Sequence, residues 1–525
     1  MMSKTLIAFI AFIGLTGHAA AADGAACRAL SDRAHSAMFA QILDAPTNIV
    51  SATVVAAGAN GEADLPEHCQ VEGNIAPQIG FLARLPITAW NGKFMMGGCG
   101  GACGTYMNQR IDPALARGYA VIVTDMGHKG MSFEFMRGNP QGQADFAYRS
   151  THLTAVVGKT LVETFYGKKA ARNYYWGCST GGRQGMMEAQ RFPEDFEGII
   201  AGAPVWNQTQ NNPFFGSWGG RVNTDKDGKP ILDAKKIPLI HDAVLAACDV
   251  RDGLKDGLLM DPRQCRWDPG TIVCKGATGT NCLSAAEVDV VRQIYDGPKD
   301  PAGTALFWGM QRGSEDQWRG WLGSDGKLGA SVVGEPTNTV LAFVGFADGQ
   351  GKPYYAPRDF DLARDPPRLG LWEFAYNAQN PDLRRFRAGA GKAILYTGWN
   401  DNNIPPGQAI DYYDTATRTM GGDVATTAFF RMFLLPAVNH CNGGAGGSEV
   451  DWIAALENWV ERGQAPDVVT AHHPVQDATA LRPARFPMPP GSFDRARPVF
   501  AYPDVARYSG RGDPALPESW AKARR

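Results

Sequence analysis

Two pairs of adjacent residues, far apart in the chain, combine a nucleophile with a base. Cys178 precedes Ser179, and His440 precedes Cys441. If the two cysteines form a disulfide, the serine hydroxyl and the imidazole lie at the same place. A serine hydroxyl is a weak nucleophile near neutral pH, so it needs a base within hydrogen-bonding reach and a third group that orients the base. Ser179 is therefore the candidate nucleophile, and His440 is its candidate base.

The serine lies in the motif Gly177-x-Ser179-x-Gly181. This pattern fits the sharp strand-to-helix turn that exposes a serine Oγ above an α/β-hydrolase sheet. An apolar run precedes the motif, a helical pattern covers residues 182–191, and the apolar segment 198–202 is typical of a parallel strand. The order of strand, turn, helix and strand predicts an α/β-hydrolase core.

Asp401 is the candidate third group. It follows a predicted strand at 392–396 and stands between Ser179 and His440 in the chain. This gives the order Ser, Asp, His that is typical of α/β-hydrolases. The sequence therefore predicts a catalytic triad of these three residues.

Acyl transfer also needs backbone N–H groups that face the developing oxyanion. Thr180, directly after the candidate nucleophile, supplies one such donor. A second is expected from the glycine cluster 97–104, which follows a predicted strand at 93–96, with Gly100 or Gly101 as the donor. Another strand is predicted at 119–124, apolar patterning returns at 428–435, and a helix is predicted at 449–462.

The first 22 residues have the composition of a secretory signal peptide. Lys4 gives a basic start, an apolar run extends from Leu6 to Leu15, and small residues end at Ala22. Such a leader is removed on export, and its apolar run is too short to span a membrane. We therefore expect a secreted or periplasmic protein without a membrane anchor.

All ten cysteines follow this leader, which favours disulfides over metal ligation. Their number alone does not fix the pairing. The short loops between Cys248 and Cys265 and between Cys274 and Cys282 favour two local bridges. The remaining cysteines are then expected to pair as Cys27–Cys69, Cys99–Cys103 and Cys178–Cys441.

Charge and length narrow the class of protein. A net charge of −2 and a pI of about 6.5 give no basic footprint for nucleic acid. A chain of 525 residues exceeds one hydrophobic core, so a second domain or a large insertion is expected. The segment from about Trp206 to Trp372, rich in polar loops, is the predicted insertion.

Three carboxylates close together in this insertion predict a metal site. Asp249, Asp252 and Asp256 lie within eight residues and are separated by glycines that permit tight turns. Hard oxygen ligands of this kind suit Ca²⁺, and the carbonyls of Leu254 and Leu258 are candidates to complete the shell. The loop is not an EF-hand, because the 12-residue spacing and the terminal Glu are missing.

With the Cys178-Ser179 motif, Asp401 and His440-Cys441 in place, the chain resembles the tannase and feruloyl esterase family of secreted serine esterases, which includes terephthalate monoester hydrolases. The similarity covers most of the chain after the leader, including residues 191–204. The resemblance implies an α/β-hydrolase core, formed by residues 23–205 and 376–525, with a lid at 206–375. It also implies the bridge Cys178–Cys441 and a structural calcium in the lid, bound by Asp249, Asp252, Asp256, Leu254 and Leu258.

The chain departs from the family pattern in two places. It has no cysteine after Cys441, so a C-terminal bridge common in the family is absent. A Cys99–Cys103 pair inside the glycine cluster is not expected from the family at large, which leaves both this bridge and the choice between Gly100 and Gly101 open.

Together these features predict a serine esterase that cleaves carboxylic esters of aromatic acids, of the feruloyl, galloyl or terephthaloyl-monoester type, through an acyl-enzyme. The alternatives are a peptidase or acyltransferase on the same fold, or a non-catalytic, calcium-stabilised binding protein. Several lid residues could contact such an acid, the aromatic ones by their flat surface and the arginines by their charge. The alternative is that the aromatic residues belong to the core and that the arginines are solvated. These residues are Trp308, Trp318, Trp321, Phe343, Phe346, Tyr354, Tyr355, Arg319 and Arg358.

Overall fold

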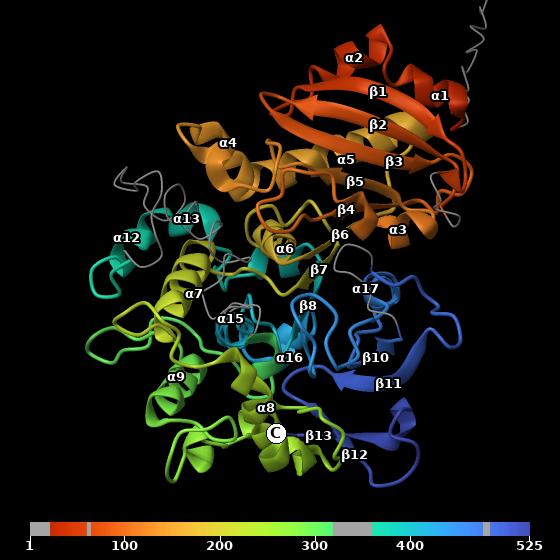
Figure 1. The fold of residues 1–525 in the computed structure, drawn as a ribbon. Helices are drawn as coiled ribbons and strands as arrows, with labels where there is room; N and C mark the ends of the chain where they lie inside the picture. Colours follow the sequence, from red (N-terminus) through yellow and green to blue (C-terminus); the bar gives the residue numbers. More distant parts are fainter. Residues whose placement is uncertain (1–21, 60–64, 319–359, 476–482, 525) are drawn as a thin grey trace, which may run out of the picture.

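A computed structural model describes residues 22–59, 65–318, 360–475 and 483–524. Its centre is a nine-stranded sheet in the order β1-β2-β3-β5-β4-β6-β7-β8-β9 (Figure 1). The strands from β1 to β3 and from β3 to β5 pair antiparallel, and all pairs from β5 to β9 are parallel. The strand bounds are β1 Thr47–Val55, β2 His68–Ile75, β3 Ile79–Pro86, β4 Lys93–Gly97, β5 Ala120–Thr124, β6 Arg172–Cys178, β7 Gly198–Gly202, β8 Lys392–Gly398 and β9 Phe430–Leu435.

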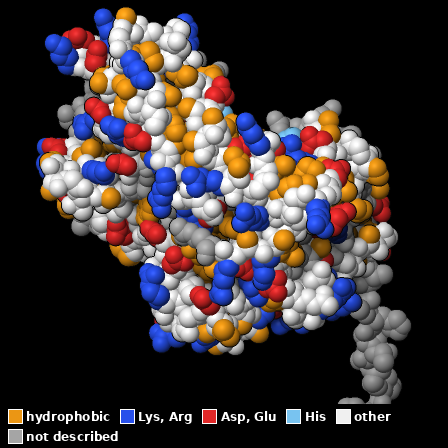
Figure 2. Space-filling model, turned by 90° about the horizontal axis from the view of Figure 1, so that it is seen from below, with side chains coloured by type: hydrophobic (Ala, Val, Ile, Leu, Met, Phe, Trp, Pro, Cys, Tyr) orange, Lys and Arg blue, Asp and Glu red, His pale blue; other side chains and the backbone are white. Residues whose placement is uncertain are grey.

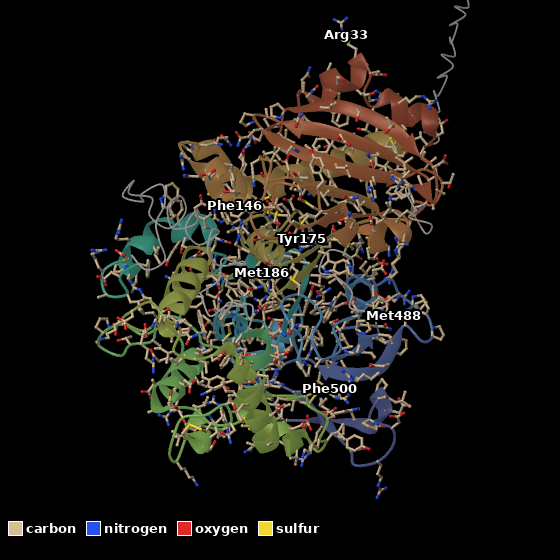
Figure 3. The ribbon with its side chains drawn as sticks, viewed as in Figure 1. Arg33, Phe146, Tyr175, Met186, Met488 and Phe500 are labelled. Atoms are coloured by element: carbon tan, nitrogen blue, oxygen red, sulfur yellow. A yellow bond between two sulfur atoms is a disulfide. The ribbon has the colours of Figure 1, made fainter. Side chains whose placement is uncertain are left out.

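Both faces of the parallel part of the sheet are buried. Successive side chains of a strand point to opposite faces, so Tyr174 and Tyr175 enter two different hydrophobic clusters, as do Ile199 and Ile200. Figure 3 places Tyr175 in the interior beside Met186 of helix α6 (Thr180–Arg191). A strand that is buried on both faces reads as a continuous apolar run, which is why these strands could be recognised in the sequence.

Helices cover the two faces of the sheet. The cluster on one face includes side chains of α5, α6 and α15, and the cluster on the other includes side chains of α3 and α17. The helix bounds outside the insertion are α1 Gly24–Ala29, α2 Arg33–Phe39, α3 Asp112–Ala116, α4 Pro140–Ala144, α5 Ser150–Tyr166, α15 Gly407–Met420, α16 Asp423–Thr427 and α17 Trp452–Arg462.

The chain between β7 and β8 packs around a hydrophobic cluster of its own. Ile240, Val291 and Trp318 are among its fully buried members. The helices of this segment are α7 Gln208–Val222, α8 Ile237–Cys248, α9 Ala285–Asp296, α12 Pro366–Leu369, α13 Glu373–Tyr376 and α14 Arg384–Ala388. A long insertion with its own core therefore stands between the elbow strand and the later strands.

Two small antiparallel sheets complete the C-terminal part. One pairs β10 (Val468–Pro474) with β11 (Phe493–Phe500), and the other pairs β12 (Val505–Tyr508) with β13 (Trp520–Ala523). Met260 of the insertion packs against Trp520 and Ala506 of the second sheet. The C-terminal segment thus packs beside the insertion, with β12 and β13 next to α8 (Figure 1).

The predicted helix at 449–462 begins too early. Glu449 instead exchanges two backbone hydrogen bonds with His472, and the Asp451 side chain caps a helix that starts at Trp452. The prediction was wrong because a pairing partner 23 residues away holds this segment extended. The other predicted helix also starts differently, since α6 begins directly after Ser179 and not at Gly182.

The structure pairs all ten cysteines, in the five pairs expected from the sequence: Cys27–Cys69, Cys99–Cys103, Cys178–Cys441, Cys248–Cys265 and Cys274–Cys282. Within the described ranges, no helix is both long enough and apolar enough to cross a bilayer. The face seen in Figure 2 mixes Lys and Arg with Asp and Glu, in agreement with the small net charge.

Candidate active site

Ser179 occupies a strained turn between β6 and α6. Its backbone has φ 65° and ψ −123°, a conformation that residues with a Cβ rarely adopt. The turn is held because the Ser179 N–H donates to the Gly202 carbonyl at 2.9 Å and the Ser179 carbonyl accepts from the Arg183 N–H at 3.0 Å. This is the geometry of a nucleophile elbow.

The glycines of the motif are required by close packing around the elbow. A Cβ on Gly177 would lie 2.6 Å from the Gly181 carbonyl oxygen, and a Cβ on Gly181 would lie 2.7 Å from the Cys99 carbonyl oxygen. Both distances are shorter than any tolerated contact. The G-x-S-x-G spacing thus allows the strand, the helix and the glycine cluster to meet at the serine.

His440 and Asp401 are joined by a hydrogen bond of 2.8 Å between Nδ1 and Oδ2. The other oxygen of Asp401 accepts from the backbone N–H groups of Asn403, at 2.9 Å, and Ile404, at 2.8 Å. Asp401 is buried, whereas 20% of the His440 side chain is exposed. A carboxylate that accepts from Nδ1–H leaves Nε2 free to accept a proton, as a general base requires.

The Cys178–Cys441 disulfide joins the elbow to the histidine loop across 263 residues of chain. Each sulfur belongs to a residue next to a candidate catalytic residue. The bridge therefore holds the two backbone segments together, with the Cα atoms of Cys178 and Cys441 6.1 Å apart.

The glycine cluster after β4 packs against the start of α6. The Thr180 hydroxyl donates to the Gly101 carbonyl at 2.7 Å, and the Cys99–Cys103 bridge closes a turn in which the Cys103 N–H donates to the Gly100 carbonyl at 3.0 Å. The Thr180 N–H is the first of its helix, so it has no acceptor within the helix. The glycine cluster therefore lies directly beside the start of α6 and the elbow.

Gln184 is a residue of this site that the sequence did not reveal. Its side-chain oxygen accepts from the Cys99 N–H at 3.3 Å and from the Tyr175 hydroxyl at 3.0 Å, so it ties the glycine cluster to α6. The available signal was its spacing, because a residue four positions after Thr180 lies on the same face of a helix.

The insertion holds the loop that carries Asp401. The Asn400 side chain donates to the Gly313 carbonyl at 2.8 Å, and the Asn402 side chain donates to the Gln317 carbonyl at 3.2 Å. Glu315 lies between Gly313 and Gln317 in the chain and is buried. Its carboxylate accepts from the Gly313 N–H at 2.8 Å and contacts His241 Nδ1 at 2.8 Å. No sequence pattern indicated these contacts, because about 85 residues separate the partners.

Of the lid residues predicted to meet a substrate, two lie in the described part of the chain. Trp318 is completely buried and donates from its indole nitrogen to Ser314 at 3.2 Å, so it belongs to the core of the insertion. Trp308 donates to Asp411 at 2.6 Å. Outside the described residues lie Trp321, Phe343, Phe346, Tyr354, Tyr355, Arg319 and Arg358.

The three aspartates of the predicted metal loop lie on one tight turn. Asp249 accepts from the backbone N–H groups of Asp256, at 3.3 Å, and Gly257, at 2.9 Å, whereas Asp252 Oδ2 is buried without a hydrogen-bond donor. Burial, together with the charges of Asp256 and Asp249, raises the pKa of Asp252 to about 7. A buried, unpartnered carboxylate oxygen beside two other carboxylates has the chemistry of an oxygen-ligand cation site.

A second cluster of possible metal ligands lies elsewhere in the structure, and its ligand atoms lie close together. Across the described ranges, His152, Glu188 and Asp195 are the one set of three such side chains whose ligand atoms lie within 4.8 Å of one another. Asp195 is already paired with Lys159 at 2.6 Å, and burial followed by the proximity of Asp195 raises the pKa of Glu188 well above its ordinary value. The Lys159 ammonium group thus already balances the charge of Asp195 in this cluster.

A family model described as tannase and feruloyl esterase matches residues 63–523. The chain belongs to this family. The resemblance seen in the sequence is confirmed, and as a member of the tannase and feruloyl esterase family the chain is a carboxylic ester hydrolase.

Individual relatives agree with this assignment. The mono(2-hydroxyethyl) terephthalate hydrolase of Piscinibacter sakaiensis is 33% identical, over 86% of this chain and 84% of its own length. A probable feruloyl esterase B-2 of Aspergillus terreus is 30% identical, over 94% of each chain. The crystal structure of feruloyl esterase B from Aspergillus oryzae superposes with a TM-score of 0.81 at 25% identity, over 95% of this chain and 100% of that one. The predicted α/β-hydrolase core is confirmed by this similarity and by the sheet itself.

Proposed function

We propose that this chain hydrolyses carboxylic esters of aromatic acids, with Ser179 as nucleophile, His440 as base and Asp401 as the group that orients the base. The observation that carries the proposal is the junction of the strained elbow with the Asp401–His440 pair through Cys178–Cys441. The substrates named for the tannase-family relatives are the reason for choosing aromatic acids.

In the proposed mechanism, Ser179 Oγ attacks the ester carbonyl while its proton passes to Nε2 of His440. Asp401 stabilises the imidazolium that forms. The Thr180 N–H and a backbone N–H of Gly100 or Gly101 donate to the oxyanion. His440 then protonates the leaving alcohol, and a water molecule attacks the acyl-enzyme by the reverse sequence of steps.

A panel of substrates tests the aromatic-ester proposal. We expect turnover of feruloyl, galloyl or terephthaloyl monoesters at a kcat/KM at least about tenfold above that of an acetyl ester of the same alcohol, because an acyl pocket that fits a ring binds it with several kcal/mol. The matched amides should react much more slowly, which separates an esterase from a peptidase. Equal rates for the acetyl and aromatic esters would reject aromatic acids as the substrate class.

We propose three further features of the protein. The core comprises residues 23–205 and 376–525, and residues 206–375 form a lid; the separate hydrophobic cluster of the insertion supports this division. Residues 1–22 are a signal peptide, and the protein is secreted or periplasmic; five disulfides fit an oxidising compartment. The lid holds one structural calcium.

The residues proposed to hold the calcium are Asp249, Asp252, Asp256 and the carbonyl groups of Leu254 and Leu258. The unpartnered oxygen of Asp252 is the observation that supports an ion there. Ligand atoms on opposite sides of a calcium ion lie about 5 Å apart, so these carboxylates need not gather as closely as the His152 cluster does. Together with Arg497, which forms an ion pair with Asp256, the ion would balance the three carboxylates and stabilise the insertion, without a part in the chemical steps.

Removal of calcium should lower stability more than it lowers the rate. A ligand present at 100 times its dissociation constant stabilises the folded state by about 2.7 kcal/mol. Chelation should therefore lower the melting temperature by about 5 °C while turnover at low temperature changes little. Asp252→Asn should lower the melting temperature and remove its dependence on calcium, whereas Asp268→Asn, at an exposed ion pair with Arg292, should retain that dependence. Protein that carries no calcium after dialysis against calcium buffer would contradict the proposal.

A further inference from the structure

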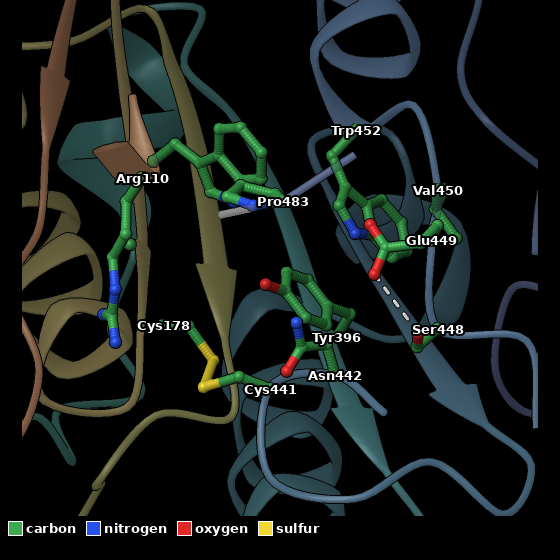
Figure 4. A pocket seen from close by; sticks show the side chains of 12 residues that line it. Arg110, Cys178, Tyr396, Cys441, Asn442, Ser448, Glu449, Val450, Trp452 and Pro483 are labelled. Atoms are coloured by element: carbon green, nitrogen blue, oxygen red, sulfur yellow. Dashed lines mark hydrogen bonds between the residues drawn. A yellow bond between two sulfur atoms is a disulfide. The ribbon is translucent and has the colours of Figure 1, made fainter. Parts of the chain in front are cut away.

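A cavity lies on the sheet face that α3 and α17 cover, directly against the Cys178–Cys441 disulfide (Figure 4). The empty space between its walls is about 530 Å³ when the open solvent at its mouth is counted, and the enclosed part is about 50 Å³. Trp176 and Tyr396 line it from the sheet, and Trp452 lines it from the start of α17. Ser179, Asp401 and His440 are not among its lining residues, so it is a second site beside the catalytic one.

The walls of this cavity are flat and aromatic. The ring of Tyr396 stacks on Trp452, with centroids 4.7 Å apart and an angle of 11° between the planes. Trp176 approaches from strand β6, which is separated from the Tyr396 strand β8 by β7, and both Tyr396 and Trp452 are buried. Aromatic rings and the disulfide give a surface on which a planar apolar group packs well.

Arg110, at the end of a short 3₁₀ turn (Asn108–Arg110), supplies a positive charge to this cavity. Within the described part of the chain, no carboxylate pairs with its guanidinium, and its Nε and Nη1 are buried without hydrogen-bond acceptors. Burial lowers the pKa of Arg110. Arg110 as a whole is partly exposed, but two of its nitrogen atoms are buried without an acceptor, which is unfavourable, so the site favours an anion.

The guanidinium lies close to the glycine cluster. A Cβ on Gly100 would lie 2.8 Å from Nη2 of Arg110, so the absence of a side chain at Gly100 leaves room for the charged group. Figure 4 shows the guanidinium near Cys178, at the disulfide end of the cavity. An anion held there would stand between the aromatic walls and the backbone proposed to bind the oxyanion.

The one carboxyl group among the lining residues does not neutralise Arg110. Glu449 accepts instead from the Ala484 N–H at 2.9 Å and from the Ser448 hydroxyl at 3.2 Å. Burial raises the pKa of Glu449, which favours its neutral form. The Glu449 carboxyl group is therefore held by donors other than Arg110.

We propose that this cavity binds a small aromatic carboxylate, with the carboxylate on Arg110 and the ring against Trp176 and Tyr396. The binding itself does not depend on the function proposed above. Only the consequence of binding for the enzyme rests on that function. Hydrolysis of an aromatic ester releases such an acid, so the site would retain the product beside the Cys178–Cys441 disulfide. The enzyme would then slow as product accumulates.

Binding of 4-fluorobenzoate to the whole protein, followed by fluorine NMR, tests the proposal. The probe is not an ester and is not consumed. We expect saturable binding of 4-fluorobenzoate and binding of the neutral 4-fluorobenzamide at least about tenfold weaker, because a hydrogen bond to a charged group accounts for a tenfold to hundredfold difference in affinity. Equal affinity for the two compounds would overturn the proposal.

Substitutions identify the charge that is responsible. Arg110→Gln should weaken 4-fluorobenzoate binding by about tenfold or more, and Arg110→Lys should restore part of it. Arg292→Gln, at a surface ion pair with Asp268, is the matched control and should bind like the wild type. Unchanged binding by a folded Arg110→Gln protein would overturn the assignment.

The catalytic pocket is the competing place for the probe. Protein whose Ser179 has been blocked by a fluorophosphonate should bind 4-fluorobenzoate with unchanged affinity, since the cavity does not include Ser179. Loss of binding on labelling would place the probe in the catalytic pocket and overturn the proposal. Failure of Ser179 to react with the fluorophosphonate would count against the proposed esterase mechanism alone, because benzoate binding is measured without turnover.

Discussion

Ser179→Ala is expected to lower kcat by about 10⁴-fold or more while the protein remains folded. The substitution removes the atom that forms the acyl-enzyme, and removal of a triad nucleophile has effects of this size in serine hydrolases. The small Ala side chain fits the strained turn, whose shape is maintained by the backbone bonds to Gly202 and Arg183. Circular dichroism and the melting temperature compare the fold of the variant with that of the wild type. The rate with an aromatic ester compares their activity.

Ser150→Ala provides the matched control. Ser150 is a completely buried serine on α5 whose hydroxyl has no hydrogen-bond partner, so its loss removes a similar group without touching the elbow. Its kcat should stay within a factor of about two of the wild-type value. If Ser179→Ala retained more than about a tenth of the wild-type activity, Ser179 would not be the nucleophile.

The second large effect is expected from the joint substitution of Cys178 and Cys441 by Ala. In the chain-entropy model a bridge across 263 residues stabilises the fold by about 5 kcal/mol, so the melting temperature should fall. The rate should fall further than stability explains, by about 10²-fold at a temperature where the variant is fully folded. A displacement of about 1 Å between nucleophile and base has a cost of this order.

The bridge between Cys274 and Cys282 serves as the comparison. It closes a loop of only 8 residues within the insertion, and neither cysteine adjoins a candidate catalytic residue. Replacing both with Ala should lower the melting temperature by less and leave kcat/KM unchanged in the cold. If the Cys178/Cys441 variant were also fully active in the cold, the bridge would be an ordinary stabilising link.

The parts of this structure that the sequence predicted are local in the chain. The parallel strands were visible as apolar runs because both of their faces are buried, and the elbow was visible because its glycines must stand at fixed offsets from Ser179. Asp401 could be selected because it follows a strand and fits the chain order of the fold. In each case a short segment contains the physical reason for its own structure.

The parts that the sequence did not predict depend on distant partners. The strands β1, β2 and β3 extend the sheet by antiparallel pairing, and no local signal placed them beside β5. The extended conformation of Glu449 depends on His472. Gln184 was not recognised because its role depends on Cys99, which lies 85 positions earlier.

The two amide contacts from Asn400 and Asn402 to the insertion constrain how the insertion of this chain can be exchanged. The segment from Gly313 to Gln317 belongs to the insertion, and it supports the loop of Asp401, the proposed acid of the triad. Grafting a relative's insertion onto this core would therefore exchange the substrate-facing surface and the scaffold of Asp401 in one step. Grafts that keep residues 313–317 of this chain separate the two, so that substrate recognition can change while the support of the Asp401 loop is kept.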